Sequence, residues 1–386
     1  MTVEKNKNNM VDFNFHGIVG LRLINPSEAD VKVITRKFEQ KPQALSSEPD
    51  IIITYKKNWQ LSDLTFIGLN TAGYYGQDFY ILSNGREDVK VIIPFEDIGN
   101  KQLNIICESG SPDVPGLNHV LNLTMISKGF LPLHSTAFRY NGKGALVMGW
   151  AKGGKSESLF SFMKNGAQYV SDEVSIVSDD GKTILGLKVP ICIWEWQFKE
   201  IPEFMPKAGL QKKMIFMLSH FIIKMQKIIN SKMLGKILPL FKSQLNLKAL
   251  PSKLFKDDKI IEKTSFDKII LAMSYDSENI IVEKISTDEV ADRMLASQMY
   301  ELEYFNQFYN IFKYAFPGKK NDFIENIKDT QQKLMYKLLI GKDAYVVKHP
   351  YPVSFKALFD KMKVIFNDGT KTKNLINANE IKEKVN

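Results

Sequence analysis

Short apolar runs separated by turn residues occupy the first part of the chain and predict a β-rich structure. Three of these runs consist mostly of β-branched and aromatic residues: 51–55, 79–82 and 89–93. Ser83-Asn84-Gly85 separates the second run from the third and is typical of a turn. The first clear break in the pattern is Pro112 to Gly116. We therefore assign residues 1–112 to a β-rich N-terminal region.

After residue 112 the apolar period indicates strands that alternate with helices. The expected elements are a helix at 117–127, strands at 133–140, 144–148 and 167–171, a helix at 155–165, and strands at 174–178 and 183–189. Asn141-Gly142 lies between the first two strands and is a strong hairpin signal. We assign residues 113–205 to one compact core.

The remainder of the chain is predicted to be largely helical. In the basic segment 206–264 we expect one or two amphipathic helices, broken at Gly235 and Pro239. Residues 265–367 are expected to resume the core, with a strand pair at 268–273 and 279–283, a short strand at 344–348, and helices at 287–315, 320–339 and 354–362. We expect residues 368–386 to form a flexible, charged tail. The predicted fold class is α/β (α+β).

The most informative motif lies between the strand at 144–148 and the helix at 155–165. Gly149-Trp150-Ala151-Lys152-Gly153-Gly154-Lys155-Ser156 matches the phosphate-binding loop pattern G-x-x-x-x-G-K-[S/T]. Phosphate binding requires this order of strand, glycine-rich loop and helix N-terminus, because backbone N–H groups then surround the phosphate. The sequence therefore predicts a nucleotide site. Its expected contact residues are Gly149, Lys152, Gly153, Gly154, Lys155 and Ser156, with Lys155 on the outer phosphates and Ser156 on Mg²⁺.

Acidic residues lie on both sides of the helix at 155–165. Asp172 and Glu173 follow the next strand directly, and we expect them to lie near the phosphate-binding loop if the strands pair. One carboxylate can hold Mg²⁺ while the other takes a proton from an attacking hydroxyl. A solvated acidic turn is the alternative. Glu157 begins the helix and either supports the metal through water or is an ordinary N-terminal acid favoured by the helix dipole.

His134 precedes the strand that leads toward the loop. A histidine at the start of a strand is most often a structural hydrogen-bonding residue, and a chemical role is the alternative. The remaining histidines have no mutual spacing that resembles a metal motif, and we assign them no chemistry: His16, His119, His220 and His349.

Positive charge is concentrated in one part of the chain. The net charge is +9, and from Pro206 to Lys256 there are eleven Lys and no Asp or Glu. Only five residues of the chain are Arg, the residue suited to bidentate contacts with base edges. We therefore expect no sequence-specific nucleic-acid partner.

The same basic segment carries an apolar face, formed by Met214, Ile215, Met217, Leu218, Phe221, Ile222, Met225, Ile228 and Ile229. Three interpretations remain open. The segment can be a helical cap folded onto the domain with its lysines in water. It can be an interface for an acidic partner or substrate, or it can attach the protein to an anionic membrane surface.

The number of cysteines and the length of the apolar stretches indicate where in the cell the protein is located. Cys107 and Cys192 are too few for a disulfide framework or a multi-cysteine metal site, and we expect two buried thiols in a reducing compartment. The polar N-terminus lacks the apolar core of a signal peptide. In the basic segment, the longest apolar stretch free of charge, 214–223, is too short to span a bilayer. We expect a cytoplasmic protein, with peripheral membrane attachment left open.

Taken together, these motifs resemble the catalytic core of HPr kinase/phosphorylase. The residues that carry the resemblance are His134-Ser135-Thr136-Ala137, Gly149 with Gly154-Lys155-Ser156-Glu157-Ser158, Lys164-Asn165-Gly166-Ala167, and Val170-Ser171-Asp172-Glu173. They cover residues 134–178 at consistent spacing. The resemblance implies a phosphoenolpyruvate carboxykinase-like nucleotide-binding fold, relative to which residues 206–256 are an insertion.

The resemblance also implies roles for individual residues. It implies ATP- and Mg²⁺-dependent phosphorylation of a hydroxyl, with Lys155 and Ser156 on phosphates and metal. Asp172 aligns with the family's proton-shuttling Asp, Glu173 with its second acid, and His134 with its active-site histidine. The catalytic residues are therefore expected to be Asp172, His134 and Lys155, and the metal ligands Ser156, Asp172 and Glu173, with Glu157 in the nucleotide site.

The chain departs from the family downstream of the acid pair. Residues 189–196 lack the E-[IV]-R-G-x-G signature of the phosphorylase function, and no P-G-R-N element follows. We therefore expect a divergent kinase acting on a different protein, peptide or small molecule. Two alternatives remain: a nucleotide-binding sensor or regulatory module with little turnover, and a carboxykinase- or phosphorylase-type activity.

Overall fold

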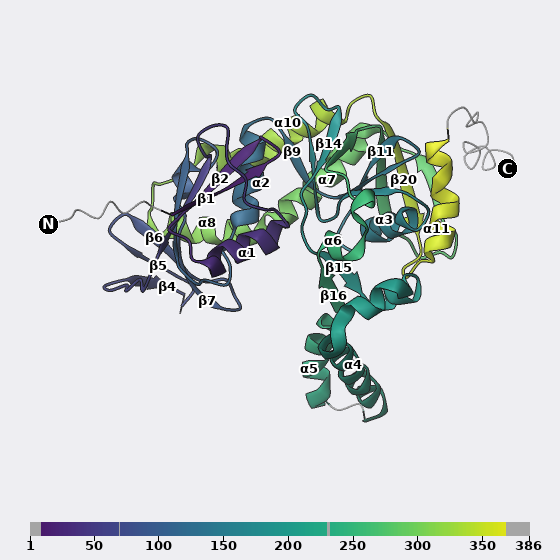
Figure 1. The fold of residues 1–386 in the computed structure, drawn as a ribbon, viewed down its shortest axis with the longest axis horizontal. Coiled ribbons are helices and arrows are strands. Elements are labelled where there is room, and N and C mark those ends of the chain that lie inside the picture. Colours follow the sequence, from purple (N-terminus) through teal and green to yellow (C-terminus); the bar gives the residue numbers. More distant parts are fainter. Residues whose placement is uncertain (1–8, 69, 230–231, 368–386) are drawn as a thin grey trace, which may run out of the picture.

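The computed structural model describes residues 9–68, 70–229 and 232–367 and has a mixed α/β fold (Figure 1). Within these residues the strands form four sheets, of eight, six, four and two strands. The N-terminal sheet lies at one end of the molecule, the six-stranded sheet lies at the other, and a helical hairpin projects below (Figure 1). The expected class, α/β, is confirmed at this level. The tail predicted at 368–386 lies outside the described residues.

The N-terminal sheet contains the predicted strands and several more. In spatial order its strands are β1 (Met10–Phe15), β2 (Val19–Ile24), β3 (Ile51–Lys56), β8 (Leu103–Glu108), β7 (Asp88–Ile92), β6 (Asp78–Ser83), β5 (Ala72–Tyr75) and β4 (Thr65–Ile67). β2, β3 and β8 run parallel. The runs expected at 51–55, 79–82 and 89–93 correspond to β3, β6 and β7.

A helix that we did not predict, α1 (Glu28–Phe38), packs on this sheet. Its start carries a capping box. The Asp30 N–H donates to Ser27 Oγ at 3.2 Å, and the Ser27 N–H donates to Asp30 Oδ2 at 2.8 Å. The signal was therefore present in the sequence as Ser27 followed three residues later by an acid.

Helices from two distant parts of the chain cover the N-terminal sheet. They are α2 (Leu117–Ser127), which matches its prediction, and α8 (Glu303–Ala315), which returns from the C-terminal half (Figure 1). Phe305 and Phe312 of α8 pack against Phe95, with ring centroids 5.6 and 5.3 Å apart. All three side chains belong to the core that the sheet builds. The C-terminal half of the chain therefore contributes to the N-terminal core as well as to its own.

The six-stranded sheet carries the loop Gly149–Ser156. Its order is β12 (Gln168–Ser171), β10 (Thr136–Tyr140), β11 (Lys143–Met148), β18 (Lys268–Ser274), β20 (Asp343–His349) and β19 (Ile281–Lys284). β11, β18 and β20 are parallel, and the hairpin expected at Asn141-Gly142 joins β10 to β11. The strands expected as a pair at 268–273 and 279–283 are not neighbours, because β20 lies between them.

Helices cover both faces of the six-stranded sheet. They are α3 (Lys155–Met163), α7 (Thr287–Glu301), α10 (Ile327–Leu339) and α11 (Phe355–Met362). Ala145 and Val147 of β11 pack with α3 and α11, whereas Leu146 and Met148 pack with α7 and α10. Because both of its faces are buried, β11 is a continuous apolar run without polar alternation.

The strand predicted at 133–140 is two strands in two different sheets. β9 (Leu131–His134) belongs to the four-stranded sheet, with β13 (Val174–Val177), β14 (Thr183–Gly186) and β17 (Lys263–Ser265), whereas β10 belongs to the six-stranded sheet. The chain changes sheet at Ser135. An apolar run does not reveal such a change, because the residues on both sides of it are buried.

Two predicted helices are also divided. The helix expected at 287–315 is α7 and α8, which meet at Leu302, where the chain turns from one core to the other. The helix expected at 320–339 is α9 (Asp322–Glu325) and α10. The other short helices are η1 (Phe95–Asp97), η4 (Asp257–Lys259), η5 (Lys363–Phe366) and α6 (Pro251–Leu254).

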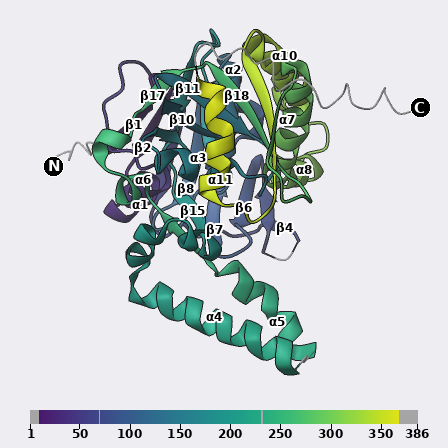
Figure 2. The same ribbon diagram turned by 90° about the vertical axis from the view of Figure 1, so that its right-hand side faces the viewer.

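The basic segment forms a helical hairpin that stands on a two-strand ribbon. The ribbon consists of β15 (Ile191–Trp194) and β16 (Asn246–Ala249), and the hairpin of η2 (Glu195–Lys199), η3 (Pro202–Ala208), α4 (Gly209–Ile229) and α5 (Lys232–Ser243) (Figure 2). The breaks predicted at Gly235 and Pro239 are wrong, because α5 runs through both. In the described part of the chain, no helix has both the length and the apolar character needed to cross a bilayer.

Candidate functional site

The loop at Gly149–Ser156 connects β11 to α3 at the carboxyl end of the parallel strands. Two glycines let it pack tightly there. A Cβ on Gly149 would lie 2.3 Å from the carbonyl oxygen of Ala272 in β18. A Cβ on Gly154, whose φ is +106°, would lie 1.9 Å from Nε2 of His349 at the end of β20. Neither position accepts a side chain without moving the loop off the sheet.

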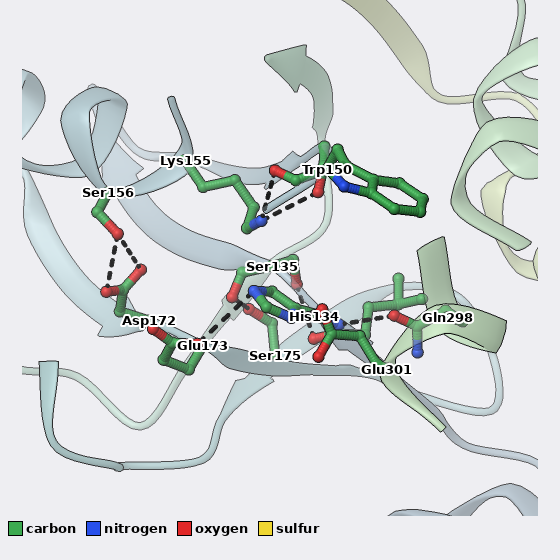
Figure 3. A network of polar contacts seen from close by, with 12 residues as sticks. His134, Ser135, Trp150, Lys155, Ser156, Asp172, Glu173, Ser175, Gln298 and Glu301 are labelled. Atoms are coloured by element: carbon green, nitrogen blue, oxygen red, sulfur yellow. Dashed lines mark hydrogen bonds and ion pairs between the residues drawn. The ribbon is translucent and has the colours of Figure 1, made fainter. Parts of the chain in front are cut away.

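The side chain of Lys155 folds back over this loop (Figure 3). Its Nζ donates hydrogen bonds to the carbonyl oxygens of Gly149, at 3.0 Å, and Trp150, at 3.1 Å. Burial lowers the pKa of Lys155, and the charges of Glu173 and Asp172 oppose that shift. The ammonium group is therefore held between the loop and the acid pair.

The acid pair Asp172-Glu173 lies where the chain crosses from one sheet to another, between β12 of the six-stranded sheet and β13 of the four-stranded sheet. Ser135 marks a second crossover, between β9 and β10. Thr136 Oγ1 donates to the Ser171 carbonyl oxygen at 2.7 Å, and Ser175 Oγ donates to the Ser135 carbonyl oxygen at 3.3 Å. These bonds hold the two crossovers side by side, and this brings the acids next to His134.

Asp172 reaches the end of the loop Gly149–Ser156. Ser156 Oγ lies 3.2 Å from Oδ1 and 3.1 Å from Oδ2 of Asp172 (Figure 3). The Asp172 side chain is buried. Burial and the charge of Glu173 raise its pKa from 3.8 to about 7, although the hydrogen bond from Ser156 opposes the shift. A carboxyl with this pKa can exchange a proton near neutral pH.

Glu173 adopts a left-handed backbone conformation with a φ of +73°. This conformation costs a residue other than glycine about 1 kcal/mol, and such strain often accompanies functional sites. The Glu173 carboxylate extends toward His134, whose Nε2 lies 3.6 Å from Oε2 (Figure 3). The strained turn therefore directs the second acid toward the histidine.

His134 is fixed from the other side by α7. Its Nδ1 lies 2.7 Å from Oε1 of Glu301, and its backbone N–H donates to Oε1 of Gln298 at 3.0 Å. Burial disfavours the charged form of Glu301, but the hydrogen bond from His134 and the histidine's charge together lower the pKa of Glu301. Both ring nitrogens of His134 thus face carboxylates.

Glu157 has a contact that neither of its expected interpretations included. Its buried Oε1 accepts a hydrogen bond from Nε2 of Gln197 at 2.8 Å, and Oε1 of Gln197 accepts one from the Trp194 N–H at 2.8 Å. Burial raises the pKa of Glu157. The side chain therefore links α3 to the root of the helical hairpin.

Aromatic side chains border the loop. Trp150 is half exposed, and its ring centroid lies 4.9 Å from that of Tyr300 in α7, with the ring planes inclined by 35°. Lys152 places its Nζ 5.3 Å from the ring centroid of Trp194. These rings offer flat apolar surfaces beside the phosphate-binding loop, of the kind that stack on a nucleotide base.

Two adjoining cavities lie near the site, and one of them is lined by Glu173 of the acid pair. One, of about 490 Å³, is lined in part by His134, Glu173 and Glu301. The other, of about 740 Å³, has a largely basic lining that includes Arg36, Lys37, Lys207, Lys248 and Lys253. Pro190 and Lys248 line both cavities. A molecule bound in the first cavity can therefore reach Glu173, the second acid of the pair.

The oxygen atoms at the loop suit Mg²⁺. Ser156 offers a hydroxyl, Asp172 offers a carboxylate in contact with it, and Glu173 follows directly. Mg²⁺ binds few protein ligands and completes its shell with water and substrate phosphates. Among the described residues, no group of three or more His, Cys, Asp or Glu side chains is arranged to hold a metal ion. The residues present therefore fit a Mg²⁺ ion that binds together with a nucleotide.

Most of the predicted site residues meet at this place: Gly149, Gly153, Gly154, Lys155, Ser156, Asp172, Glu173 and His134. Lys152 lies beside Trp194, and Glu157 contacts Gln197 instead. The sequence reasoning missed Gln298, Tyr300 and Glu301, for which α7 gives no local signal. It also missed His349, whose position at the end of the predicted strand 344–348 was the available clue.

We expect Glu301→Gln to remove a pH-dependent contribution to stability. Because the folded-state pKa of Glu301 is lowered, this contribution is present above the ordinary pKa and is lost as pH falls through the folded-state value. The carboxylate is partly exposed, so the loss at about pH 6 should be at most about 1 kcal/mol and should disappear toward about pH 3. Urea unfolding at both pH values measures it. The exposed Glu278→Gln is the matched control, and equal destabilisation at both pH values would contradict the expectation.

The loop, the histidine and the two acids come from separate segments that meet only in the folded chain. β9, the loop with α3, the β12–β13 crossover and α7 each contribute at least one of the polar groups. The arrangement of these polar groups is therefore described from the contacts within this chain. No protein-family model matches the chain, and no curated protein matches it.

Proposed function

We propose that this protein is an ATP- and Mg²⁺-dependent kinase of the HPr-kinase-like group, with a phosphoenolpyruvate carboxykinase-like nucleotide-binding core. Its acceptor is a hydroxyl group, of Ser or Thr in a protein or peptide or of a small molecule. The observation that carries the proposal is the contact between Ser156 and Asp172. It joins a buried carboxyl group with a raised pKa to the end of a phosphate-binding loop.

The loop is suited to hold the phosphates of ATP. Backbone N–H groups at the N-terminus of α3 favour negative charge, and Lys155 needs only to leave the carbonyl oxygens of Gly149 and Trp150 to meet a phosphate. Ser156, Asp172 and Glu173 are the residues that would hold Mg²⁺. When bound, Mg²⁺ supplies positive charge that offsets the charge of the transferring phosphoryl group.

Asp172 is placed to accept the proton of the acceptor hydroxyl. In the reaction the acceptor O–H bond breaks, its proton passes to Asp172, and the oxygen bonds to the γ-phosphorus. The bond from that phosphorus to the β,γ-bridging oxygen breaks, and ADP leaves with its electron pair. A pKa of about 7 allows Asp172 to be ionised before the transfer and to hold the proton after it.

His134 and Glu301 act on the second acid. His134 is held by Glu301 at 2.7 Å and lies 3.6 Å from Glu173, so it orients that carboxylate at the mouth of the 490 Å³ cavity. This cavity is the place where the acceptor would enter. Its size suits a side chain of a peptide or a small molecule.

The test is incubation of the purified full-length chain with γ-labelled ATP and a lysate of its own host, followed by identification of the labelled species. We expect one or a few labelled products with the wild type. Lys155→Ala should lose labelling by about 10²-fold or more, because it removes the charge beside the transferring group. Lys164→Ala, at an exposed Lys just beyond α3, is the matched control and should label normally.

The alternative functions give different results in the same system. If ATP binds and Lys155→Ala abolishes that binding, but no label is transferred, the protein is a nucleotide sensor and the kinase proposal is wrong. If inorganic phosphate or pyrophosphate replaces ATP in the reaction, the phosphorylase- or carboxykinase-type activity is correct instead.

A further inference from the structure

The helical hairpin exposes a continuous apolar stripe along α4. The stripe consists of Leu210, Met214, Met217, Phe221 and Ile228, which are between 61% and 81% exposed. Their spacing of three, four and seven residues places them on one side of the helix. Leu218 and Ile229 widen the same side. Phe216 and Ser219, on the opposite side, are buried. Seven large apolar side chains on one helix face are thus each more than half exposed.

Lysines lie beside this apolar stripe. Lys213 and Lys224 fall next to it on the helix. Between residues 206 and 256 the chain has eleven Lys and no acidic residue. A surface that matches the hairpin would therefore offer an apolar layer to the stripe and negative charges to the lysines beside it. An anionic lipid bilayer has this chemistry.

The hairpin also has a suitable position. It stands clear of both large sheets in two perpendicular views (Figures 1 and 2). An extended flat surface can therefore meet α4 along its length without first meeting the rest of the molecule. This rules against the interpretation in which the segment caps the domain, because the stripe is not folded onto the core. A second copy of the chain is disfavoured as the occupant, because it would bring the same lysines against each other.

We propose that the α4–α5 hairpin attaches the protein to anionic membranes by laying the α4 stripe into the lipid interface. The lysines at its margin contact acidic headgroups, and the apolar side chains enter the acyl boundary. The attachment is peripheral, and it depends on salt because the lysines contribute through charge. It does not require nucleotide, so it stands or falls separately from the kinase proposal.

The test is cosedimentation of the full-length chain with vesicles made of three parts phosphatidylcholine and one part phosphatidylserine. We expect binding at low salt, weaker binding at high salt, and much weaker binding to vesicles of phosphatidylcholine alone. The double variant Met217→Gln/Phe221→Gln should bind at least about tenfold more weakly. Lys213→Glu/Lys224→Glu should bind at least about 25-fold more weakly, because each lysine near an anionic surface contributes about fivefold.

Matched variants separate the stripe from general surface effects. Phe66→Gln, at an exposed apolar residue of the N-terminal sheet, and Lys41→Glu/Lys57→Glu, at exposed lysines of the N-terminal region, should bind like the wild type. All of these side chains are exposed or lie on the projecting hairpin, so their variants should fold, and circular dichroism verifies this.

Three results would overturn the proposal. The first is absence of binding to the anionic vesicles at low salt. The second is binding to soluble polyglutamate, with the same loss in Met217→Gln/Phe221→Gln, but not to vesicles, which would identify an acidic protein as the partner. The third is a wild-type dimer in sedimentation velocity that the same variant converts to a monomer, which would identify a second copy as the occupant of the stripe.

Discussion

Replacing Asp172 with Asn should abolish phosphoryl transfer and at the same time make the protein more stable. The amide cannot accept the hydroxyl proton, so transfer should fall by about 10²–10⁴-fold, the usual contribution of a general base. Asn nevertheless keeps nearly the same size and can still hydrogen-bond to Ser156. Because Ser156 and Glu173 remain as the other proposed Mg²⁺ ligands, ATP binding should persist. Initial rates with labelled ATP and equilibrium nucleotide binding measure the two effects.

The gain in stability follows from the direction of the pKa shift. Asp172 holds its proton up to about pH 7 in the folded chain but only up to about pH 4 when unfolded. Between these values the folded state binds more protons, so rising pH lowers the free energy of unfolding. Asn cannot ionise and avoids this loss. The variant should therefore exceed the wild type by roughly 1–4 kcal/mol at about pH 8, with a smaller difference at about pH 5.

Two comparisons make this expectation specific. The wild-type transfer rate should fall toward acid pH, because protonation of Asp172 removes the base. Asp179→Asn, in the exposed turn that follows β13, should change neither the rate nor the stability by more than about 0.5 kcal/mol. A variant of Asp172 that keeps full transfer activity would remove this residue as the base. A loss of stability at pH 8 would show that the carboxylate is better accommodated than its burial indicates.

The sequence was informative where the signal is local. The loop Gly149–Ser156, the hairpin at Asn141-Gly142 and the helix at 117–127 depend on turn chemistry and on apolar period within a few residues, and all three are found. The sequence also predicted that Asp172 lies near the loop, although this proximity depends on strand pairing between more distant segments. β12 lies beside β10, and Asp172 reaches Ser156 because the crossover to the second sheet begins directly after β12.

The parts that could not be predicted depend on contacts between distant segments. Ser135 lies in an apolar run that reads as one strand, and only the pairing of β9 with β13 and of β10 with β11 divides it. Glu301 and Gln298 contact His134 from α7, and Gln298 lies 164 residues from His134 in the sequence. The chain divides into α7 and α8 at Leu302 because α7 packs into the core of the six-stranded sheet, whereas α8 packs into the core of the N-terminal sheet. No pattern within a window of a few turns carries that information.

Gly154→Ala should damage the phosphate-binding loop severely. The new Cβ would lie 1.9 Å from Nε2 of His349, at a backbone φ of +106°. The histidine ring cannot move aside easily, because it is fully buried and its nitrogens lie 2.7 and 3.0 Å from the carbonyl oxygens of Pro350 and Gly153. We expect a loss of roughly 3–5 kcal/mol in the free energy of unfolding, or loss of ATP binding if the loop yields instead. Urea unfolding and nucleotide titration distinguish these outcomes.

Comparison with other glycines separates backbone strain from the steric clash. Gly142 has a similar φ of +76° but open space around its Cα, so Gly142→Ala should cost only about 1–2 kcal/mol. Removing the imidazole ring with His349→Ala should restore part of the stability that Gly154→Ala loses. The double variant should therefore be more stable than the sum of the two single effects predicts. His349→Ala should not rescue Gly149→Ala, whose Cβ meets the backbone oxygen of Ala272. If Gly154→Ala costs no more than Gly142→Ala, then the loop does not rest on His349, and this residue has no part in positioning the phosphate site.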